Sequence, residues 1–516
     1  MATAFFMNSR FRLRCAFPLH APYPPLSLSV SRFSLFLSSL SQPPSLREVD
    51  SFTRMLSLRP TPSIVQFNKI LGSLAKANHF PTAISLFYQL QLTPITPDLF
   101  TFNILMNCCC GMGHMTPAFS VFAKILRMHY QPSTVTLTTL LKGLCLSCNL
   151  HKALLFHDRV LAQGFQFDQV TYGTLINGLC KTGHTADAIQ VLGKIPQYGI
   201  VPNVFMYNAI IDSLCKDTLE AIDLLNDMVL KNITPNVLTY TTLIDGLCKD
   251  GNIKDAKSVL AIMTKDGVKP NVVTYNSLMD GYCLFNELNK AKHVFNKMTQ
   301  SGVAPDVRSY NIMINGLCKI IMVDEALNLL EEMHHKNLVP NTVTYNTLID
   351  GLCKSRRISC ALELLEKMHD RGQPANLITY NSLLDGMFKN QELDKALVLF
   401  NKMIDIGIEL NIYTYNILID GLCKSGRLTD AKEIFQDVPA RGYRPNVWTY
   451  TVMINGLCKE GLLEEALALL SEMEDNGCLP NGVTFEIIIR ALFEKDENDM
   501  AEKVFRDMIA RGLLNG

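Results

Sequence analysis

The sequence lacks several features, and each absence excludes a class of protein. It has one Trp among 516 residues, and no uncharged apolar run of about 18 residues, so it predicts no membrane insertion. Lys and Arg number 48 and so do Asp and Glu, which argues against a polycation that holds nucleic acid by charge alone. No His-x-Glu, glycine-rich phosphate loop or nucleophile elbow occurs. We therefore predict no enzyme activity, no cofactor and no metal.

The first 47 residues lack acidic residues and Lys but contain five Arg, with frequent Ser from Ser27 to Ser45. This composition is typical of an organelle transit peptide, and a disordered tail is the alternative. Three of the arginines, Arg10, Arg12 and Arg14, lie near the start. They favour the mitochondrion over the chloroplast.

A length of 516 residues is too great for one hydrophobic core and indicates several domains or a repeat array. An aromatic residue followed by a small polar one recurs every 35 residues, as at Tyr275-Asn276 and Tyr310-Asn311, with one step of 33 after Tyr207. This register defines thirteen units, and the position of a residue is counted from the start of its unit. The units are 64–98, 99–133, 134–168, 169–203, 204–236, 237–271, 272–306, 307–341, 342–376, 377–411, 412–446, 447–481 and 482–516.

Each unit carries two apolar stripes at helical spacing, which predicts a helical hairpin that must stack on its neighbours. The twentieth position is Ala in twelve units, as at Ala291 and Ala326, and Ala221 takes the same place in the shortened fifth unit, so we expect close helix contacts there. The unit of 33 residues loses two residues near Asp217-Thr218. Residues 48–63 carry a further stripe, which predicts a helix that caps the first unit.

The cysteines are regular but have no metal-ligand spacing. Ten of the sixteen lie at the twelfth position of a unit, as at Cys248 and Cys318. Neighbouring helices lie about 10 Å apart, which is beyond disulfide reach. We therefore expect small buried hydrophobic residues in a reducing compartment.

The period, the two helices and the motif Val-x-Tyr-Asn-x-Leu-Ile-x-Gly-Leu-Cys-Lys, carried for example by 272–276 and 344–354, resemble the pentatricopeptide repeat. The plain length of the units resembles the P class, and 66–71 and 137–145 resemble its restorer-of-fertility-like branch in plants. The resemblance implies an all-α, right-handed superhelical α-solenoid. It also implies sequence-specific binding of single-stranded RNA in an organelle, one base per repeat.

In the family, the fifth and last residues of a unit face a base edge. Asn and Thr offer neutral donors and acceptors, whereas Asp offers only acceptors. The alternative is that Asn caps a helix. The fifth/last pairs of the first twelve units are Asn68/Asp98, Asn103/Ser133, Thr138/Asp168, Gly173/Asn203, Asn208/Asn236, Thr241/Asn271, Asn276/Asp306, Asn311/Asn341, Asn346/Asn376, Asn381/Asn411, Asn416/Asn446 and Thr451/Asn481. The thirteenth pair, Glu486/Gly516, departs from the pattern.

The second residue of a unit packs against base faces in the family, and apolar, aromatic and guanidinium side chains suit that role. These residues are Val65, Phe100, Val135, Val170, Phe205, Leu238, Val273, Arg308, Val343, Ile378, Tyr413, Trp448 and Val483. Lys recurs at the thirteenth position, where it can meet a phosphate or favour the helix macrodipole. These lysines are Lys76, Lys181, Lys216, Lys249, Lys319, Lys354, Lys389, Lys424 and Lys459.

The family code pairs Asn/Asp with U, Thr/Asp with G, Thr/Asn with A, and both Asn/Asn and Asn/Ser with C. The units then read U, C, G, unassigned, C, A, U, C, C, C, C, A and unassigned, a target of about 11–13 nucleotides with a pyrimidine-rich centre. A recruited nuclease or other protein would act on the bound RNA. The alternative function is an α-solenoid scaffold for protein–protein contacts, against which the uniform Asn and Thr speak.

Overall fold

The computed structural model describes residues 46–147, 149–214 and 218–513. These residues form 27 α-helices, α2 to α28, and contain no strand. The predicted all-helical fold is therefore confirmed over the described residues, with 26 paired helices and one more before them. The predicted transit peptide lies almost entirely outside the described residues. No helix among those described is long and apolar enough to span a membrane.

Close contacts divide the chain into two parts, Met1–Met206 and Tyr207–Gly516, with the division inside α11 (Val204–Ser213). The first part contains α2 (Leu46–Ser57), α3 (Ile64–Lys76), α4 (Phe80–Gln91), α5 (Leu99–Gly111), α6 (Met115–Arg127), α7 (Thr134–Leu146), α8 (Leu150–Ala162), α9 (Gln169–Lys181), α10 (Thr185–Lys194) and the 3₁₀-helix η2 (Ile195–Tyr198).

The second part continues with the same alternation of helices. It contains α12 (Thr218–Leu230), α13 (Val237–Lys249), α14 (Ile253–Lys265), α15 (Val272–Leu284), α16 (Leu288–Gln300), α17 (Val307–Lys319), α18 (Val323–His335), α19 (Thr342–Lys354), α20 (Ile358–Asp370), α21 (Leu377–Lys389), α22 (Leu393–Asp405), α23 (Ile412–Lys424), α24 (Leu428–Ala440), α25 (Val447–Lys459), α26 (Leu463–Asp475), α27 (Gly482–Glu494) and α28 (Asn498–Ala510). The predicted shortening at Asp217 lies outside the described residues, but α11 ends three residues before the other first helices of its kind.

The first helix of most units begins at a polar cap. Asn341 accepts a hydrogen bond from the backbone N–H of Thr344, and the hydroxyl of Thr344 accepts one from the backbone N–H of Asn341. This reciprocal capping box satisfies two backbone donors that the helix leaves free. It recurs at Asp98, Ser133, Asn236, Asn271, Asp306, Asn376 and Asn446.

The turn between the two helices of a unit contains one residue with positive φ. Gly251, Gly426 and Gly461 occupy this place without steric cost. Ile321 occupies the same place at φ 66°, and its branched side chain is exposed. A β-branched residue is strained in this conformation.

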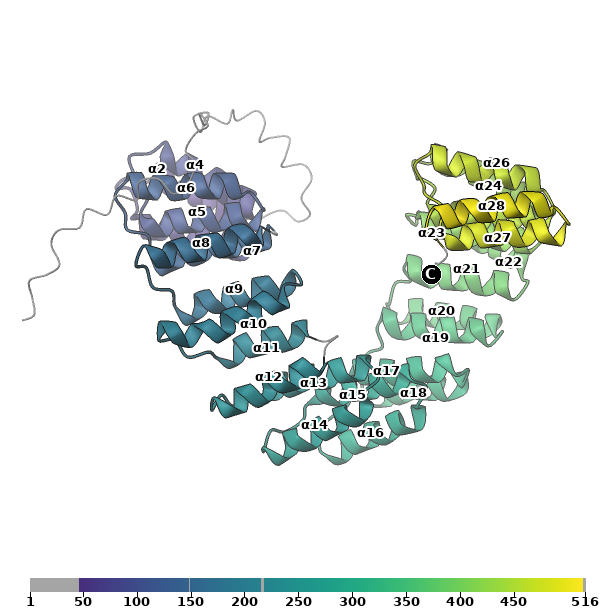
Figure 1. Ribbon diagram of the computed structural model, residues 1–516, viewed down its shortest axis with the longest axis horizontal. Coiled ribbons are helices and arrows are strands. Elements are labelled where there is room, and N and C mark those ends of the chain that lie inside the picture. Colours follow the sequence, from purple (N-terminus) through teal and green to yellow (C-terminus); the bar gives the residue numbers. More distant parts are fainter. Residues whose placement is uncertain (1–45, 148, 215–217, 514–516) are drawn as a thin grey trace, which may run out of the picture. The chain divides into compact units, whose positions relative to one another are not determined.

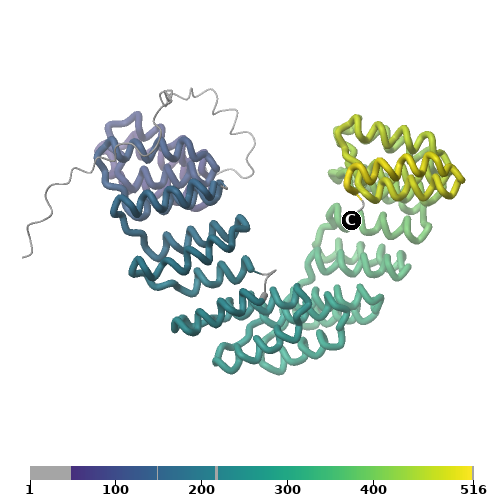
Figure 2. The backbone as a smooth tube through the Cα atoms, viewed as in Figure 1, coloured from purple at the N-terminus to yellow at the C-terminus, as the bar shows by residue number. Residues whose placement is uncertain are grey.

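Consecutive first helices pack directly on one another within each part, as the stacked helices of Figure 1 and the tube of Figure 2 show. The Ala at the twentieth position, or Ala221 in the shortened fifth unit, is buried in every unit, as at Ala291 and Ala326. A larger side chain there would overpack the hairpin. In the first part, α2 lies against the first unit, where Phe52 and Phe67 meet edge to face at 5.1 Å and Ser73 donates to Glu48 at 2.9 Å.

A second close contact joins seven first helices to the next one among the described residues. The Cys at the twelfth position lies against the Gly at the tenth position of the following unit, as Cys318 does against Gly351. A Cβ added to Gly351 would lie 2.5 Å from the sulfur of Cys318. Eight of the ten regular cysteines are buried, as predicted, Cys180 is half-buried, and Cys215 lies outside the described residues. The absence of a side chain at the glycine therefore leaves the space that the thiol of the preceding unit occupies.

Candidate nucleic-acid interface

The second residue of each unit points into solvent although it is apolar in twelve of thirteen cases. The exposed fraction of these twelve side chains runs from 42% at Val273 to 69% at Val170, and Arg308 is exposed as well. They stand on the first turn of each first helix, whose other apolar residues are largely buried. The exposed apolar side chain therefore recurs at one fixed position of the unit.

In five units the fifth residue is hydrogen-bonded to the last residue of its own unit. The amide nitrogen of Asn276 donates to a carboxylate oxygen of Asp306 at 3.2 Å, and Asn68 donates to Asp98 at 3.1 Å. The pairs Asn208/Asn236, Asn311/Asn341 and Asn346/Asn376 make the same bond at 3.4 Å. In these units the structure brings together the two residues that the sequence assigns to one base.

The other seven pairs depart from this arrangement, because no hydrogen bond joins their two members among the described residues. These pairs are Asn103/Ser133, Thr138/Asp168, Gly173/Asn203, Thr241/Asn271, Asn381/Asn411, Asn416/Asn446 and Thr451/Asn481. The sequence predicts these residues as base-reading pairs without separating bonded from unbonded ones, and the structure joins only five of the twelve pairs by a hydrogen bond.

Four of the last residues in these pairs also lack the reciprocal capping box. Asp168, Asn203, Asn411 and Asn481 each accept a hydrogen bond from the backbone N–H three residues later, at 2.8–3.1 Å. Asn203 is half-buried and the other three are exposed. The cap rather than the fifth residue therefore orients these four side chains, which were predicted as base-reading residues.

The reason for the missing bond lies at the fifth position. Gly173 has no side chain with which to reach Asn203. The hydroxyl of Thr138 lies 2.7 Å from that of Thr171 in the following unit, so this short side chain does not turn to Asp168. Asn381 is buried, and its oxygen has no hydrogen-bond partner among the described residues.

Two further units use the hydroxyl of Thr in the same way. Thr241 and Thr451 are buried, and their hydroxyls lie 2.7 and 2.8 Å from the hydroxyls of Thr274 and Thr484 in the following units. A Thr at the fifth position thus bonds to the next unit and makes no bond to the last residue of its own unit.

The two members of a pair differ in exposure and in their second task. The fifth residue is mostly buried or half-buried, whereas most last residues are exposed, as are Asn341 and Asn376. The last residue is also the N-cap of the next first helix, so the capping role weighed against base reading is present at that position. The capping bond uses one side-chain oxygen of the last residue and leaves one outward polar group: a carboxylate oxygen in Asp, an amide N–H₂ in Asn.

Two acidic last residues, Asp98 and Asp306, are held in their ionised form. Burial raises the pKa of Asp306, but hydrogen bonds from the backbone and hydroxyl of Ser309 and from Asn276 outweigh it, and the pKa is lowered overall. The same balance lowers the pKa of Asp98, where Thr101 and Asn68 donate. At neutral pH these two residues therefore offer only acceptors.

The two units whose pairs depart from the family pattern have no assigned base. Glu486 is exposed, and the last residue of its unit lies outside the described residues. At Gly173 the space that a side chain would take borders the ring of Phe205, 3.4 Å from the added Cβ.

The lysines of the thirteenth position fall into two groups. Lys249, Lys354, Lys389 and Lys424 each make an ion pair at 2.6 Å with the Asp four residues earlier. Lys76, Lys181, Lys319 and Lys459 make no ion pair within the described ranges, and Lys216 lies outside them. The paired group can be read from the sequence, because each of its lysines follows an Asp at the ninth position by four residues.

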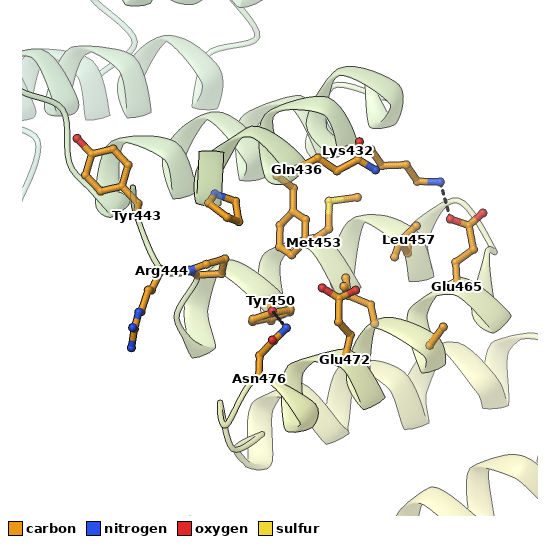
Figure 3. A pocket seen from close by; sticks show the side chains of 15 residues that line it. Lys432, Gln436, Tyr443, Arg444, Tyr450, Met453, Leu457, Glu465, Glu472 and Asn476 are labelled. Atoms are coloured by element: carbon orange, nitrogen blue, oxygen red, sulfur yellow. Dashed lines mark hydrogen bonds and ion pairs between the residues drawn. The ribbon is translucent and has the colours of Figure 1, made fainter. Parts of the chain in front are cut away.

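A cavity of about 780 Å³ lies elsewhere, between α24, α25 and α26 (Figure 3). It is lined by Phe435, Met453 and Leu457, with the Lys432–Glu465 ion pair on one side. No residue predicted to contact RNA lines it. Within the described residues no group of three His, Cys, Asp or Glu side chains could hold a metal ion.

Helical hairpins that recur about every 35 residues, most with polar residues at the fifth and last positions and with an exposed side chain at the second, define a helical-repeat protein. The PPR repeat family model matches residues 62–111, 97–146, 168–216, 202–249, 238–284, 270–319, 321–354, 340–389, 375–424, 414–459 and 445–494, and a PPR repeat model matches 483–513. The chain belongs to the pentatricopeptide repeat family.

Two curated relatives match over single stretches. A mitochondrial pentatricopeptide repeat-containing protein of Arabidopsis thaliana is 47% identical over 47 residues, 9% of this chain and 9% of that protein. Another from the same plant is 42% identical over 48 residues, 9% of this chain and 10% of that protein. The matched stretch is thus a small fraction of each relative's length.

The fold is similar to a solved structure over most of its length. The crystal structure of the pentatricopeptide repeat protein PPR10 from maize aligns with a TM-score of 0.54 at 24% identity, over 90% of this chain and 77% of that one. This likeness supports the solenoid fold.

Proposed function

We propose that this chain binds single-stranded RNA sequence-specifically, with one base per repeat, in a plant organelle. We assign it to the P class and to the restorer-of-fertility-like branch. The bound RNA would be about 11–13 nucleotides long, at one nucleotide for each of up to thirteen units. The outcome would be a change in transcript processing, stability or translation, and a recruited nuclease or other protein would supply any chemistry.

The observation that carries the proposal is the recurrence of an exposed apolar side chain and an outward polar edge in unit after unit. An aromatic or aliphatic side chain at the second position can stack on a base of any identity, which gives affinity. The fifth/last pair offers a different set of donors and acceptors from unit to unit, which gives discrimination. A scaffold for proteins would have no need of this regular arrangement.

The outward group of the last residue supplies a reason for the code. The ring N3 of uracil carries a proton and that of cytosine does not. A carboxylate such as Asp306 accepts from uracil, whereas the amide of Asn341 donates to cytosine. Asn276/Asp306 therefore suits U, and Asn311/Asn341 suits C.

Phosphates would be contacted most strongly where the lysine is not already paired. Lys319 and Lys459 present a full positive charge at the end of a first helix, while Asp350 partly neutralises Lys354. Formally, the whole chain carries no net charge. Local cations and stacking, rather than bulk attraction, would hold the RNA.

We propose a mitochondrial location, with the chloroplast as the alternative. The Arg-rich, acid-free start of the sequence supports an organelle address, and one relative is named as mitochondrial. Fusion of residues 1–60 to a fluorescent reporter tests this, since a reporter that stays in the cytosol contradicts it.

The test of base reading is the variant Thr241→Asn in the sixth unit. An amide replaces a hydroxyl that lies 2.7 Å from the Thr274 hydroxyl, so the pair becomes Asn/Asn and the preferred base should change from A to C. The measurement is a gel-shift titration against RNAs that differ only at that base. Each mismatch should cost on the order of 1–3 kcal/mol.

The matched control is Thr242→Asn, the same substitution one residue along the same helix. It should leave the ranking of the RNAs as in the parent. If Thr241→Asn also leaves the ranking unchanged, the residue does not read a base and the proposed register is wrong.

A further inference from the structure

The amides of the fifth position are held by a residue from the next unit. Of the eight Asn at this position, six accept a hydrogen bond through Oδ1 from the hydroxyl at the third position of the following unit, at 2.6–2.9 Å. The donors are Thr101, Thr136, Thr239, Ser309, Thr344 and Thr379, and each is fully buried. These contacts join residues 31 or 33 positions apart in the sequence.

The hydroxyl decides which end of the amide faces inward. The hydroxyl of Thr344 accepts from the backbone N–H of Asn341 at 3.2 Å and has one proton to donate. Its oxygen lies closer to the oxygen of Asn311, at 2.7 Å, than to that of Asn341, at 3.1 Å, so the proton goes to Asn311. With the oxygen turned toward Thr344 at 2.7 Å, the nitrogen is turned toward Asn341 at 3.4 Å. One N–H is then left to meet a ligand. Because Thr344 is fully buried, water does not compete for this bond.

We propose that the hydroxyl at the third position of the following unit is a positioning residue for base recognition. It fixes the amide of the preceding fifth residue so that a donor, not an acceptor, faces the base. This inference rests on the proposed function, since it concerns how the same residues discriminate between bases. Thr344 acts through Asn311 and does not itself reach the base.

The consequence is discrimination between the two pyrimidines. In an Asn/Asn unit the fixed N–H adds a second donor to that of the last residue, which suits the acceptors N3 and O2 of cytosine and opposes the N3–H of uracil. In Asn68/Asp98 and Asn276/Asp306 the carboxylate meets that N3–H, and the fixed N–H faces a carbonyl oxygen of uracil. Without the hydroxyl, only the 3.4 Å bond to Asn341 holds the amide of Asn311, so the amide can turn its oxygen outward and accept from uracil. Loss of the hydroxyl should therefore raise binding of U relative to C at this unit alone.

The chain contains a matched unit without this contact. Thr449 makes the same capping bonds to Asn446 as Thr344 makes to Asn341, and it is equally buried. Yet the oxygen of Asn416 has no hydrogen-bond partner among the described residues. Both units carry an Asn/Asn pair, so they differ in the contact and not in the expected base.

The experiment compares Thr344→Val with Thr449→Val in the full chain. Binding constants are measured for RNAs with C or U opposite the eighth unit and opposite the eleventh. Thr344→Val should reduce the C/U ratio at the eighth base by about fivefold, the factor for one net hydrogen bond. Thr449→Val should leave the ratio at the eleventh base unchanged, although both variants lose similar cap stability in urea unfolding.

Two further variants complete the test. Thr344→Ser keeps the hydroxyl, as Ser309 does naturally, and should restore the parental ratio. If Thr344→Val does not fold, Thr379→Val tests the same contact with Asn346 one unit later.

An unchanged C/U ratio in folded Thr344→Val, or an equal change in Thr449→Val, overturns the positioning role. Asn311→Thr separates this failure from failure of the proposed function. If Asn311→Thr changes the base preference while Thr344→Val does not, base reading stands and the positioning role falls. If neither variant changes it, both fall.

Discussion

The contact between Gly351 and Cys318 gives a prediction whose sign follows from two opposing effects. Ala is a better helix former than Gly by about 0.5–1 kcal/mol, so Gly351→Ala in the middle of α19 should stabilise an isolated helix. In the folded chain the new Cβ would lie 2.5 Å from the sulfur of Cys318 and 2.9 Å from its Cβ. Atoms this close must separate, so α17 and α19 would have to shift apart.

The magnitude follows from the balance of these effects. Overpacking by one methyl group in a close-packed contact costs about 1–3 kcal/mol, and the helix preference offsets about 0.5–1 kcal/mol of it. We expect a net loss of about 0–2.5 kcal/mol. Cys318→Ala removes the sulfur, so the double variant should lose less than the two single losses added together.

The assay is urea unfolding followed by circular dichroism, with the parent, both single variants and the double variant at one protein concentration. The control is Gly72→Ala in α3, where the nearest atom to an added Cβ, Cδ1 of Ile104, lies at 3.9 Å. That variant should be stabilised, because the contact is an ordinary one. A Gly351→Ala protein as stable as Gly72→Ala would refute the reasoning.

Three further outcomes are expected. Ile321→Gly should raise the unfolding free energy by about 1 kcal/mol, because it relieves a left-handed conformation at an exposed residue; a thermal melt with no gain counts against strain there. Lys319→Gln should lower the salt slope of RNA binding by about 1, and Lys354→Gln by less, because Asp350 already pairs with Lys354; equal slopes from filter binding would exclude this difference. The lowered pKa of Asp306 contributes stability that is present above the unfolded pKa and lost as pH falls through the folded one. Asp306→Asn should therefore have a flatter stability profile in urea between pH 7 and about 3; identical profiles would contradict it.

The sequence predicted the helices well because each carries local signals. Every helix carries an apolar stripe, the first helix of a unit also follows an Asx or Ser residue, and Gly or Asn follows many helices, all within one unit. In the unit 272–306 the apolar stripes predict helices over 272–284 and 289–300. The first matches α15, and the second falls short of α16 by one residue, at Leu288. The family resemblance then supplied the candidate base-reading positions, which the residues alone do not identify.

The contacts between units could not be read in the same way. Thr344 reaches Asn311 across 33 residues, and that separation becomes a contact only once the hairpins stack. For the same reason the sequence could not separate a bonded pair from an unbonded one: Asn346/Asn376 and Asn381/Asn411 have identical letters, but only the first makes the bond.

The side-chain contacts along the solenoid differ in how far the sequence alone predicts them. The regular Gly and Cys residues are both evident in the sequence, but their contact depends on how closely α17 approaches α19 in the folded chain. The ion pairs of the lysines were accessible from spacing alone, since Asp350 and Lys354 are four residues apart.

The last residue of a unit has two roles, because it both caps the next helix and stands at the proposed base-reading edge. The residues that cap helices well are Ser, Thr, Asp and Asn, and the last positions of the first twelve units contain only Asp, Asn and Ser. The need to cap a helix thus restricts the residue types that can determine base preference at this position. Exchange of Asp for Asn changes the group offered to a ligand while the cap is kept, so target preference can drift between relatives with little loss of stability. A residue that caps poorly would cost about 1 kcal/mol of folding stability at every such unit, whatever base it could recognise.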